Sequence, residues 1–206
     1  MKEQKSWSEE GGINELNDAR KIKFVTGNLN KFQEAKLILS EYNFELEMDK
    51  TKIQEIQNDE IEIIGKISVK EAQTRVSGPI IMEDAGLFIK ELNGFPGAYS
   101  AYVHKTLGCK WILKLLESVE NRTAEFKSVI AYAKDAETPT IKIFKGIVKG
   151  KISRKMFGYR GFGFDPIFIP EQLGRTFGEL GLEEKNKYSH RSMALKRFAS
   201  WYIANT

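Results

Sequence analysis

The chain has 206 residues, of which 41% are hydrophobic and 29% are charged, and its formal net charge is +4. These values are typical of a globular protein with a sizeable core, and so small a net charge does not by itself indicate a nucleic-acid-binding protein. Cys109 is the only cysteine, which excludes a disulfide framework and fits the reducing cytoplasm, where we expect the protein. No apolar run approaches the roughly 18 residues that a membrane-spanning helix needs.

The N-terminal residues 1–20 are polar and contain no apolar signal-peptide core. Residues 9–12, which read Glu-Glu-Gly-Gly, are typical of a flexible segment. We therefore expect residues 1–20 to form a polar extension and residues 21–206 to form a single domain.

Strand and helix patterns follow one another along the rest of the chain. Strands are predicted at residues 22–26, 44–48, 79–83, 86–90, 124–134, 141–148 and 165–169, and helices at residues 29–40, 59–76, 107–119 and 192–204. Because strands alternate with helices early and a β-rich run fills the second half, we expect an α/β protein with a mixed sheet. A lobe is expected around the pair of strands within residues 124–148, with residues 136–140 as their hairpin connection.

Three of the predicted helices carry apolar residues at helical spacing, which marks the face that each turns toward the rest of the protein. These residues are Phe32, Ala35 and Leu39 in the first helix, Trp111, Leu115 and Val119 in the third, and Leu195, Phe198 and Tyr202 in the last.

The turn after the first strand is the first candidate for chemistry. Residues 26–31 read Thr-Gly-Asn-Leu-Asn-Lys and join the strand to a helix N-terminus, where backbone amides attract anions. Gly27 allows a ligand to approach the backbone closely, Asn28 can cap the helix, and Lys31 provides a charge suited to phosphate. An ordinary strand–turn–helix corner is the alternative interpretation, and the segment alone does not decide between them.

Acidic residues form a second candidate. Glu83 and Asp84 follow one another at a strand end, so their side chains point to opposite faces and one of them can face a cleft. Carboxylates there suit Mg²⁺, which prefers oxygen ligands. Glu55 is a further oxygen ligand if its loop returns to the same cleft. A solvated acidic turn is the alternative interpretation.

Glycines and aromatic residues alternate in residues 158–166. Such a segment can offer a flat stacking surface to a base, with Asp165 accepting hydrogen bonds from ring N–H groups. The alternative is a bend whose aromatic side chains fill the core.

A basic segment precedes the last helix. Ser189 is a candidate N-cap, and the pair His190 and Arg191 conflicts with the helix dipole unless it faces something anionic or electron-rich. A solvated charged loop is the alternative. The other histidine, His104, is interpreted as structural.

Taken together, these segments resemble one family, the HAM1-like inosine/xanthosine triphosphate pyrophosphatases, which hydrolyse deaminated purine nucleoside triphosphates. The resemblance covers residues 21–206 and rests on four motifs in family order, at residues 26–31, 83–87, 162–165 and 189–191 with Lys185 upstream. Residues 84–89 and 94–101 look most like the archaeal branch. The resemblance implies an elongated, two-lobed α/β protein with a long mixed central sheet flanked by helices, a cleft between the lobes, and a homodimer.

The same resemblance implies roles for particular residues. The triphosphate would be held by Thr26, Gly27, Asn28, Leu29, Asn30 and Lys31. Asp84 would be the proton acceptor and, with Glu55, a Mg²⁺ ligand. Base and nucleotide contacts would come from Ala85, Phe162, Gly163, Phe164, Asp165, Lys185, His190 and Arg191.

Two positions depart from the family pattern. Ala85 stands where many members have Ser or Thr, so a hydroxyl contact is missing while a backbone amide contact remains available. Ser68 stands, by spacing, where many members have a nucleotide-contacting lysine, and Lys66 and Lys70 flank it.

The implied function is Mg²⁺-dependent hydrolysis of ITP, dITP and XTP to the nucleoside monophosphate and pyrophosphate, which cleanses the nucleotide pool. Three alternatives stay open: a pyrophosphatase for other modified nucleoside triphosphates, a non-catalytic nucleotide sensor, and a single-strand nucleic-acid-binding module that stacks bases on Phe162 and Phe164. The presence of both Asp84 and Glu55 favours the enzyme, because a non-catalytic sensor would not need both carboxylates. The modest net charge and the acidic pair argue against the nucleic-acid-binding module. We expect no membrane partner.

Overall fold

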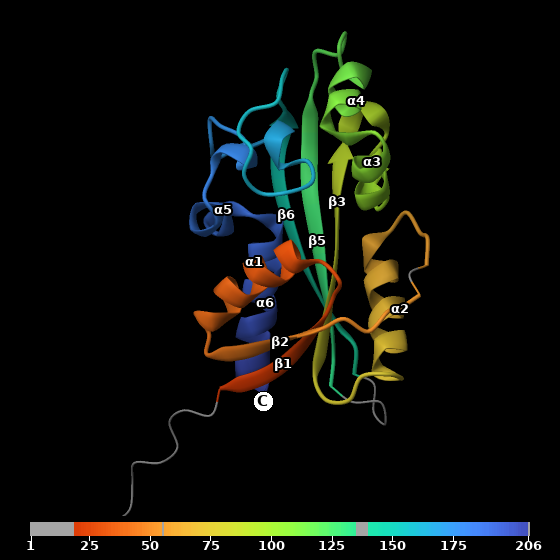
Figure 1. Cartoon of the computed structure of the whole chain (residues 1–206), viewed down its shortest axis with the longest axis vertical. Helices are drawn as coiled ribbons and strands as arrows, with labels where there is room; N and C mark the ends of the chain where they lie inside the picture. The colour runs from red at the N-terminus through yellow and green to blue at the C-terminus, as the bar shows by residue number, and fades with distance from the viewer. Residues whose placement is uncertain (1–18, 55, 135–139, 206) are drawn as a thin grey trace, which may run out of the picture.

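The computed structural model describes residues 19–54, 56–134 and 140–205, and these residues form one long mixed sheet with helices on both faces (Figure 1). Along the sheet the strands follow the order β2-β1-β3-β5-β6-β7, and β4 pairs with β3. Their bounds are β1 Arg20–Val25, β2 Phe44–Asp49, β3 Ile80–Ile89, β4 Pro96–Gly97, β5 Thr123–Ala133, β6 Lys142–Ile152 and β7 Phe168–Pro170. β1 runs parallel to β2 and β3, and the other pairs are antiparallel. The expected mixed α/β sheet is therefore confirmed.

Different helices cover the sheet at the two ends of the elongated molecule (Figure 1). At the end that holds β1 and β2, α1 (Leu29–Ser40) and α6 (His190–Asn205) cover one face of the sheet and α2 (Ile61–Gln73) covers the other (Figure 1). At the opposite end, α3 (Ser100–Thr106) and α4 (Gly108–Leu115) lie on the side of α2, and α5 (Leu182–Tyr188) lies on the side of α6. Short 3-10 turns lie at Lys90–Leu92, Asp165–Ile167 and Phe177–Glu179.

β5 links the hydrophobic clusters of the protein because its side chains alternate between the faces of the sheet. Ile130 and Tyr132 pack with α1 and α6, whereas Ala131 and Ala133 pack with α2. Further along, Phe126 belongs to the cluster at the far end. The strand is consequently buried on both faces along most of its length.

Most predicted elements are confirmed, with α1 at the expected bounds, but several differ. The strands expected at 79–83 and 86–90 form one strand, β3, because Asp84 and Ala85 continue the pairing with Val129 and Ser128. β5 and β6 do not build a lobe of their own; β5 pairs with β3 over the whole length of β3. The strand expected at 165–169 begins only at Phe168, as β7, because Asp165–Ile167 form a 3-10 turn. Residues 1–18 of the expected extension, and 136–139 of the expected hairpin connection, lie outside the described residues.

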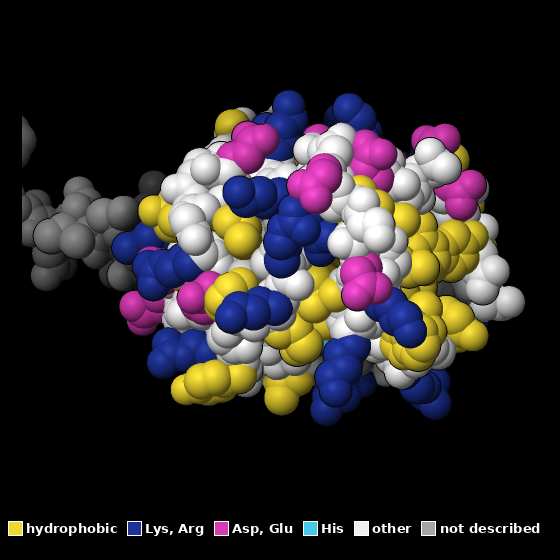
Figure 2. All heavy atoms as spheres, turned by 90° about the horizontal axis from the view of Figure 1, so that it is seen from above, with side chains coloured by type: hydrophobic (Ala, Val, Ile, Leu, Met, Phe, Trp, Pro, Cys, Tyr) yellow, Lys and Arg dark blue, Asp and Glu magenta, His cyan; other side chains and the backbone are white. Residues whose placement is uncertain are grey.

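Two residues of the apolar stripe expected in the third helix, Trp111 and Leu115, are exposed, whereas the third, Val119, packs against the core. Trp111 and Leu115 on α4 are each 50% accessible, whereas Cys109, Ile112 and Leu116 take the inner face. The two sets of apolar residues are offset by one position along the helix. The set that contains Ile112 faces the core because Ile112 packs there. Seen along the long axis, hydrophobic side chains gather on the side of α3 and α4 (Figure 2). Within the described ranges, no helix has both the length and the apolar character needed to cross a membrane.

Candidate active site

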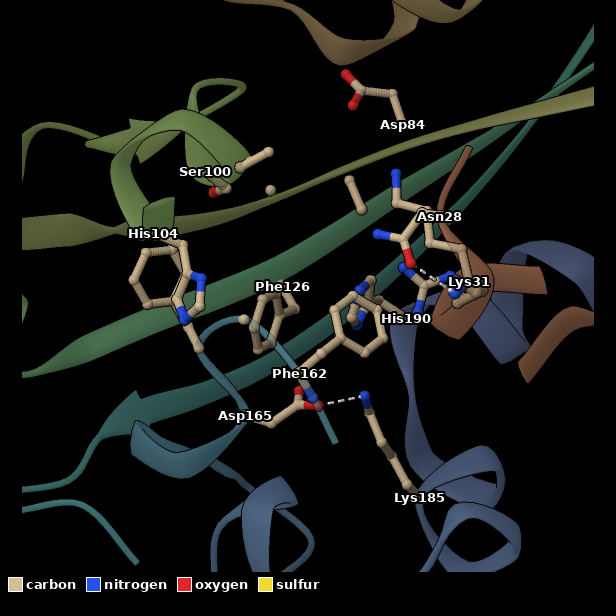
Figure 3. A pocket seen from close by; sticks show the side chains of 16 residues that line it. Asn28, Lys31, Asp84, Ser100, His104, Phe126, Phe162, Asp165, Lys185 and His190 are labelled. Carbon is tan, nitrogen blue, oxygen red and sulfur yellow. Dashed lines mark hydrogen bonds and ion pairs between the residues drawn. The ribbon is translucent and has the colours of Figure 1, made fainter. Parts of the chain in front are cut away.

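A pocket of about 310 Å³ opens between the two ends of the molecule, within the size range of small-molecule sites (Figure 3). Residues from all four sequence motifs line it. They are Asn28, Lys31, Asp84, Ala85, Phe162, Gly163, Phe164, Asp165, Lys185, His190 and Arg191. Thr26, Gly27, Leu29 and Asn30 are not among its lining residues, and Glu55 lies outside the described residues. The motifs therefore converge although the first and last of these lining residues, Asn28 and Arg191, are 163 positions apart along the chain.

The turn between β1 and α1 is held by its own side chains. Thr26 Oγ1 accepts a hydrogen bond from the Asn28 amide at 3.1 Å, and Asn28 Oδ1 accepts one from the Lys31 amide at 3.1 Å. Asn28 is thus the N-cap of α1, as expected. A Cβ atom added to Gly27 would meet nothing within 4 Å, so the packing of the protein itself does not require glycine there.

Glu83 and Asp84 point to opposite faces of β3, as strand geometry predicts. The Glu83 side chain is fully buried and contacts Lys31 Nζ at 2.9 Å, Arg191 Nη2 at 3.1 Å and Ser128 Oγ at 2.7 Å. Burial by itself raises the pKa of Glu83, but Arg191 and Lys31 outweigh it and hold the pKa far below its ordinary value. Asp84 is the residue of the pair that lines the pocket, and its carboxylate points away from the side of β3 on which Lys31 and His190 lie (Figure 3).

Glu34 on α1 connects the cations of the pocket, and the sequence motifs did not include it. It is 2% exposed, its Oε1 accepts a hydrogen bond from Lys185 Nζ at 2.8 Å, and its Oε2 pairs with Arg191. Burial raises its pKa, but the fields of Arg191 and Lys185 together leave the pKa below its ordinary value. The available signal was a carboxylate beside Ala35 and one turn before Ile38, on the buried face of the helix.

Asp165 shares Lys185 with Glu34. Its Oδ2 lies 2.5 Å from Lys185 Nζ and also accepts a hydrogen bond from the Phe162 amide at 2.8 Å. Burial raises the pKa of Asp165 despite the nearby lysine. This carboxylate fixes the glycine-rich loop, and Gly161 permits the contact because a Cβ atom there would lie 2.1 Å from Asp165 Oδ2. One oxygen of the carboxylate that was expected to meet a base therefore already has partners within the protein.

Aromatic rings form the wall between Asp84 and the Lys185–Asp165 pair (Figure 3). Lys185 Nζ lies 4.8 Å from the centroid of Phe162, and the Arg191 guanidinium lies 5.3 Å from it. His190 stacks on Phe126 with ring centroids 4.6 Å apart and an interplanar angle of 10°. Phe164 is 2% exposed and packs in the core, as the structural alternative for the glycine–aromatic segment predicts, and it also lines the pocket. The ligand interpretation stays a prediction.

His190 and Arg191 at the start of α6 face an electron-rich ring and two carboxylates, as expected, but His190 does so without a charge. Burial and the neighbouring Arg191 charge lower the pKa of His190 well below its ordinary value, so the imidazole is neutral. Arg191 keeps its charge and satisfies it with Glu34 and Glu83, which removes the conflict with the helix dipole. Ser189 caps the helix as expected, since its Oγ accepts a hydrogen bond from the Ser192 amide at 3.1 Å.

Five lining residues were not selected from the sequence: Gly86, Ser100, Ala101, His104 and Phe126. His104, interpreted from the sequence as structural, is exposed on α3 and meets Phe164 edge-to-face with centroids 5.2 Å apart. Three of the five lie on or beside α3, a short helix that the sequence pattern did not predict, so their approach to the pocket had no sequence signal.

Comparison with known proteins places the chain. The sequence profile of the Ham1 family matches residues 22–201. The chain belongs to the Ham1 family. It is 49% identical to the dITP/XTP pyrophosphatase of Methanopyrus kandleri over 90% of this chain and 97% of the relative, and 48% identical to that of Thermococcus kodakarensis over 90% and 98%. Its fold matches the HAM1 protein from Coxiella burnetii with a TM-score of 0.77, 27% identity and coverage of 90% of this chain and 99% of the other.

Most charged side chains of this Ham1 pocket form ion pairs with one another. Lys31, Lys185 and Arg191 each pair with at least one of the carboxylates of Glu34, Glu83 and Asp165. Across the described ranges, no group of three or more His, Cys, Asp or Glu side chains is arranged to hold a metal ion. Asp84 is a further carboxylate that lines the same pocket.

Proposed function

We propose that the chain is a pyrophosphatase for non-standard purine nucleoside triphosphates, which hydrolyses dITP, ITP and XTP to the monophosphate and pyrophosphate. The observation that carries the proposal is a single pocket that joins a capped helix N-terminus and Lys31 to an aromatic wall with Lys185 and Arg191. Relatives named dITP/XTP pyrophosphatase, 43% to 49% identical and aligned over nearly their whole length, support it.

In this proposal the triphosphate lies at the N-terminus of α1. The amide groups of the turn at residues 26–31 and the macrodipole of α1 favour an anion, and Lys31 Nζ adds a point charge beside them. Lys31 already pairs with Glu83, so its side chain is held in place before the nucleotide binds. Preorganised charge of this kind stabilises the negative charge that develops on phosphate oxygens during transfer.

Mg²⁺ is the cation that the proposal requires. The described cations near the pocket are already matched by buried carboxylates, so they do not compensate a triphosphate fully. Asp84 lines the pocket and would hold the ion, with Glu55 as the second proposed ligand. Bound Mg²⁺ neutralises charge on the transferring phosphoryl groups.

Asp84 is also the proposed proton acceptor for the attacking water, which would attack the α phosphorus and release pyrophosphate. A positioned general base contributes about 10² to 10⁴ in rate. We therefore expect Asp84→Asn to lower kcat by at least about 10² with a smaller change in KM, as general base catalysis requires. Near-normal turnover in the purified variant would remove Asp84 from this role.

The base pocket supplies the proposed specificity. Hypoxanthine and xanthine carry a 6-oxo acceptor where adenine carries an amino donor, and Arg191 or a backbone N–H would pair with the oxygen. A buried donor that faces another donor in ATP would discriminate by roughly 10⁴. Phe162, over which both Lys185 and Arg191 lie, is the proposed stacking surface for the ring.

The proposal also includes a cytoplasmic homodimer built from residues 21–206 of each copy. Exposed apolar side chains on α3, on α4 and between them support a protein contact on that side (Figure 2); they are Tyr102, Leu107, Trp111 and Leu115. Sedimentation of the purified protein tests the dimer. A monomer at micromolar concentration, unchanged by Trp111→Glu, would contradict it.

The deciding experiment measures pyrophosphate release from ITP, dITP, XTP, GTP, ATP and dUTP, with Mg²⁺ and with a chelator. We expect rapid release from the first three and loss of activity with the chelator. Preference for dUTP or another modified nucleotide would indicate the pyrophosphatase of different specificity. Binding of ITP without pyrophosphate release would indicate the non-catalytic sensor.

A further inference from the structure

A second, much smaller cavity lies between α2 and β3, apart from the main pocket. Its volume is about 20 Å³, and its lining includes Ile64 and Ser68 of α2 together with Met82 and Asp84 of β3. A cavity needs roughly 10–15 Å³ to hold one water molecule, so this cavity has room for one and no larger ligand. Asp84 lines both cavities, so the small one lies beside the proposed catalytic residue.

Ser68 contributes a polar atom with unmet hydrogen-bonding capacity to this cavity. The residue is 4% exposed, and its hydroxyl has no hydrogen-bond partner among the residues that the structure describes. A serine within a helix commonly bonds to the carbonyl four residues earlier, which is that of Ile64, but Ser68 does not. Leaving a buried hydroxyl unpaired is unfavourable, so the side chain requires a partner that fits the space beside it.

Strand geometry decides which carboxylate faces Ser68. Glu83 also lines the small cavity, but its carboxylate contacts Lys31, Arg191 and Ser128 on the α1 and α6 side of the sheet. Asp84, the next residue, points to the α2 side. The cavity therefore has two polar side chains turned toward it, the hydroxyl of Ser68 and the carboxylate of Asp84.

We propose that one bound water bridges Ser68 Oγ and the Asp84 carboxylate, and that Ser68 is thereby a positioning residue for Asp84. The proposal rests on the proposed function, because it assigns a purpose to the orientation of Asp84. The water donates one hydrogen bond to the Asp84 carboxylate. Toward Ser68 it either donates its other hydrogen to Oγ or accepts a hydrogen bond from the hydroxyl. Ser68 is not among the lining residues of the main pocket, so it acts on the reaction through Asp84 and not through the nucleotide.

The bridge has a specific kinetic consequence. Partners that orient a functional ligand commonly change activity about 10- to 100-fold when they are removed. We expect Ser68→Ala to lower kcat for ITP by about tenfold with KM nearly unchanged. Ser68→Cys keeps nearly the same volume but replaces the hydroxyl with a poor hydrogen-bonding group, so it should lose turnover as the alanine variant does.

Ser153→Ala is the matched control. Ser153 is likewise 4% exposed, and its hydroxyl donates to the Lys155 carbonyl at 2.5 Å, but it lines neither the main pocket nor the small cavity. Its variant should lose stability without losing kcat. Full turnover in Ser68→Cys beside low turnover in Ser68→Ala would show that Ser68 only fills space, and would overturn the proposal.

A crystal structure of the unmodified protein at a resolution that shows ordered water is the direct test. We expect one water within hydrogen-bond distance of both Ser68 Oγ and an Asp84 oxygen, and its loss in Ser68→Ala. A Ser68 hydroxyl bonded to the Ile64 carbonyl, with no water beside it, would overturn the bridge. If Asp84→Asn keeps full turnover, the proposed role of Asp84 fails whatever the water does. If Asp84→Asn is inactive and Ser68→Ala is fully active, only the bridge fails.

Discussion

Glu34 and Lys185 form an ion pair at 2.8 Å although they are 151 positions apart, and the side chains of both are no more than 3% exposed. The same carboxylate pairs with Arg191 at the start of α6. One residue of α1 therefore fixes two of the cations proposed to read the base, while Lys31, one turn earlier, faces the proposed triphosphate. Arg191 also pairs with Glu83, which in turn pairs with Lys31, so one network of ion pairs connects the residues proposed to bind the triphosphate with those proposed to bind the base.

Replacing Glu34 with Gln should destabilise the protein by about 3–5 kcal/mol, because removing one partner of a buried ion pair leaves the other charges uncompensated. Equilibrium unfolding in urea measures this. Glu45→Gln is the control, since Glu45 pairs with Lys21 on the surface and its loss should cost less than about 1 kcal/mol. Equal, small losses in both variants would show that Glu34 does not hold the cations.

The stabilisation from Glu34 should also disappear in acid. Its folded pKa lies below the ordinary value of 4.5, so its contribution is present above that value and is lost as the pH falls through the folded pKa. The difference in unfolding free energy between the unmodified protein and Glu34→Gln should therefore shrink progressively below pH 4.5. A difference that stays constant down to the acid transition would contradict the assigned shift.

His190 should make stability depend on pH in a separate, higher window. Its folded pKa lies well below the ordinary value of 6.5, so the unfolded chain takes up a proton below pH 6.5 that the folded protein excludes. Stability should fall with decreasing pH there, with a slope that approaches about 1.4 kcal/mol per pH unit from this group. His190→Phe, which keeps a ring against Phe126, should remove that slope. NMR titration of the His190 ring with an ordinary midpoint would contradict the prediction.

The sequence predicted local features of the site well because they depend on neighbouring residues. The N-caps at Asn28 and Ser189, and the opposite directions of Glu83 and Asp84, follow from rules that act over one to four positions. The bounds of α1 follow from the same kind of rule. Each of these predictions needed only the local backbone.

Contacts between residues far apart in the sequence could not be predicted from local patterns. Whether a carboxylate such as Glu34 is buried with two cations depends on where α5 and α6 return, and nothing local encodes that. The choice between Trp111 and Ile112 as the inner face of α4 was likewise decided by tertiary packing, because two stripes one position apart have the same period. The charge state of His190 depends on burial, so the sequence alone favoured a cation.

Gly86 and Gly27 allow the effect of a side chain on folding to be tested separately from its effect on ligand binding. A Cβ atom at Gly86 would lie 2.2 Å from the Gly97 carbonyl oxygen, so Gly86→Ala should cost about 1–3 kcal/mol of stability as the paired strands move apart. Gly27→Ala meets nothing within 4 Å and should change stability by less than about 0.5 kcal/mol. If the triphosphate approaches the backbone at Gly27, that variant should nevertheless raise KM for ITP. An unchanged KM would place the triphosphate elsewhere.

Lys31 can be tested for a role beyond its pairing with Glu83, to whose carboxylate and carbonyl oxygen it lies at 2.9 and 3.1 Å. Lys31→Met should lower kcat/KM for ITP by about 10- to 100-fold, the effect of losing one hydrogen bond to a charged group. It should also destabilise the protein, because Glu83 loses a partner. Adding Glu83→Gln removes the unpaired charge, so the double variant should regain part of the stability but none of the kcat/KM. Recovery of kcat/KM together with stability would mean that Lys31 acts only by neutralising Glu83 and does not contact the nucleotide.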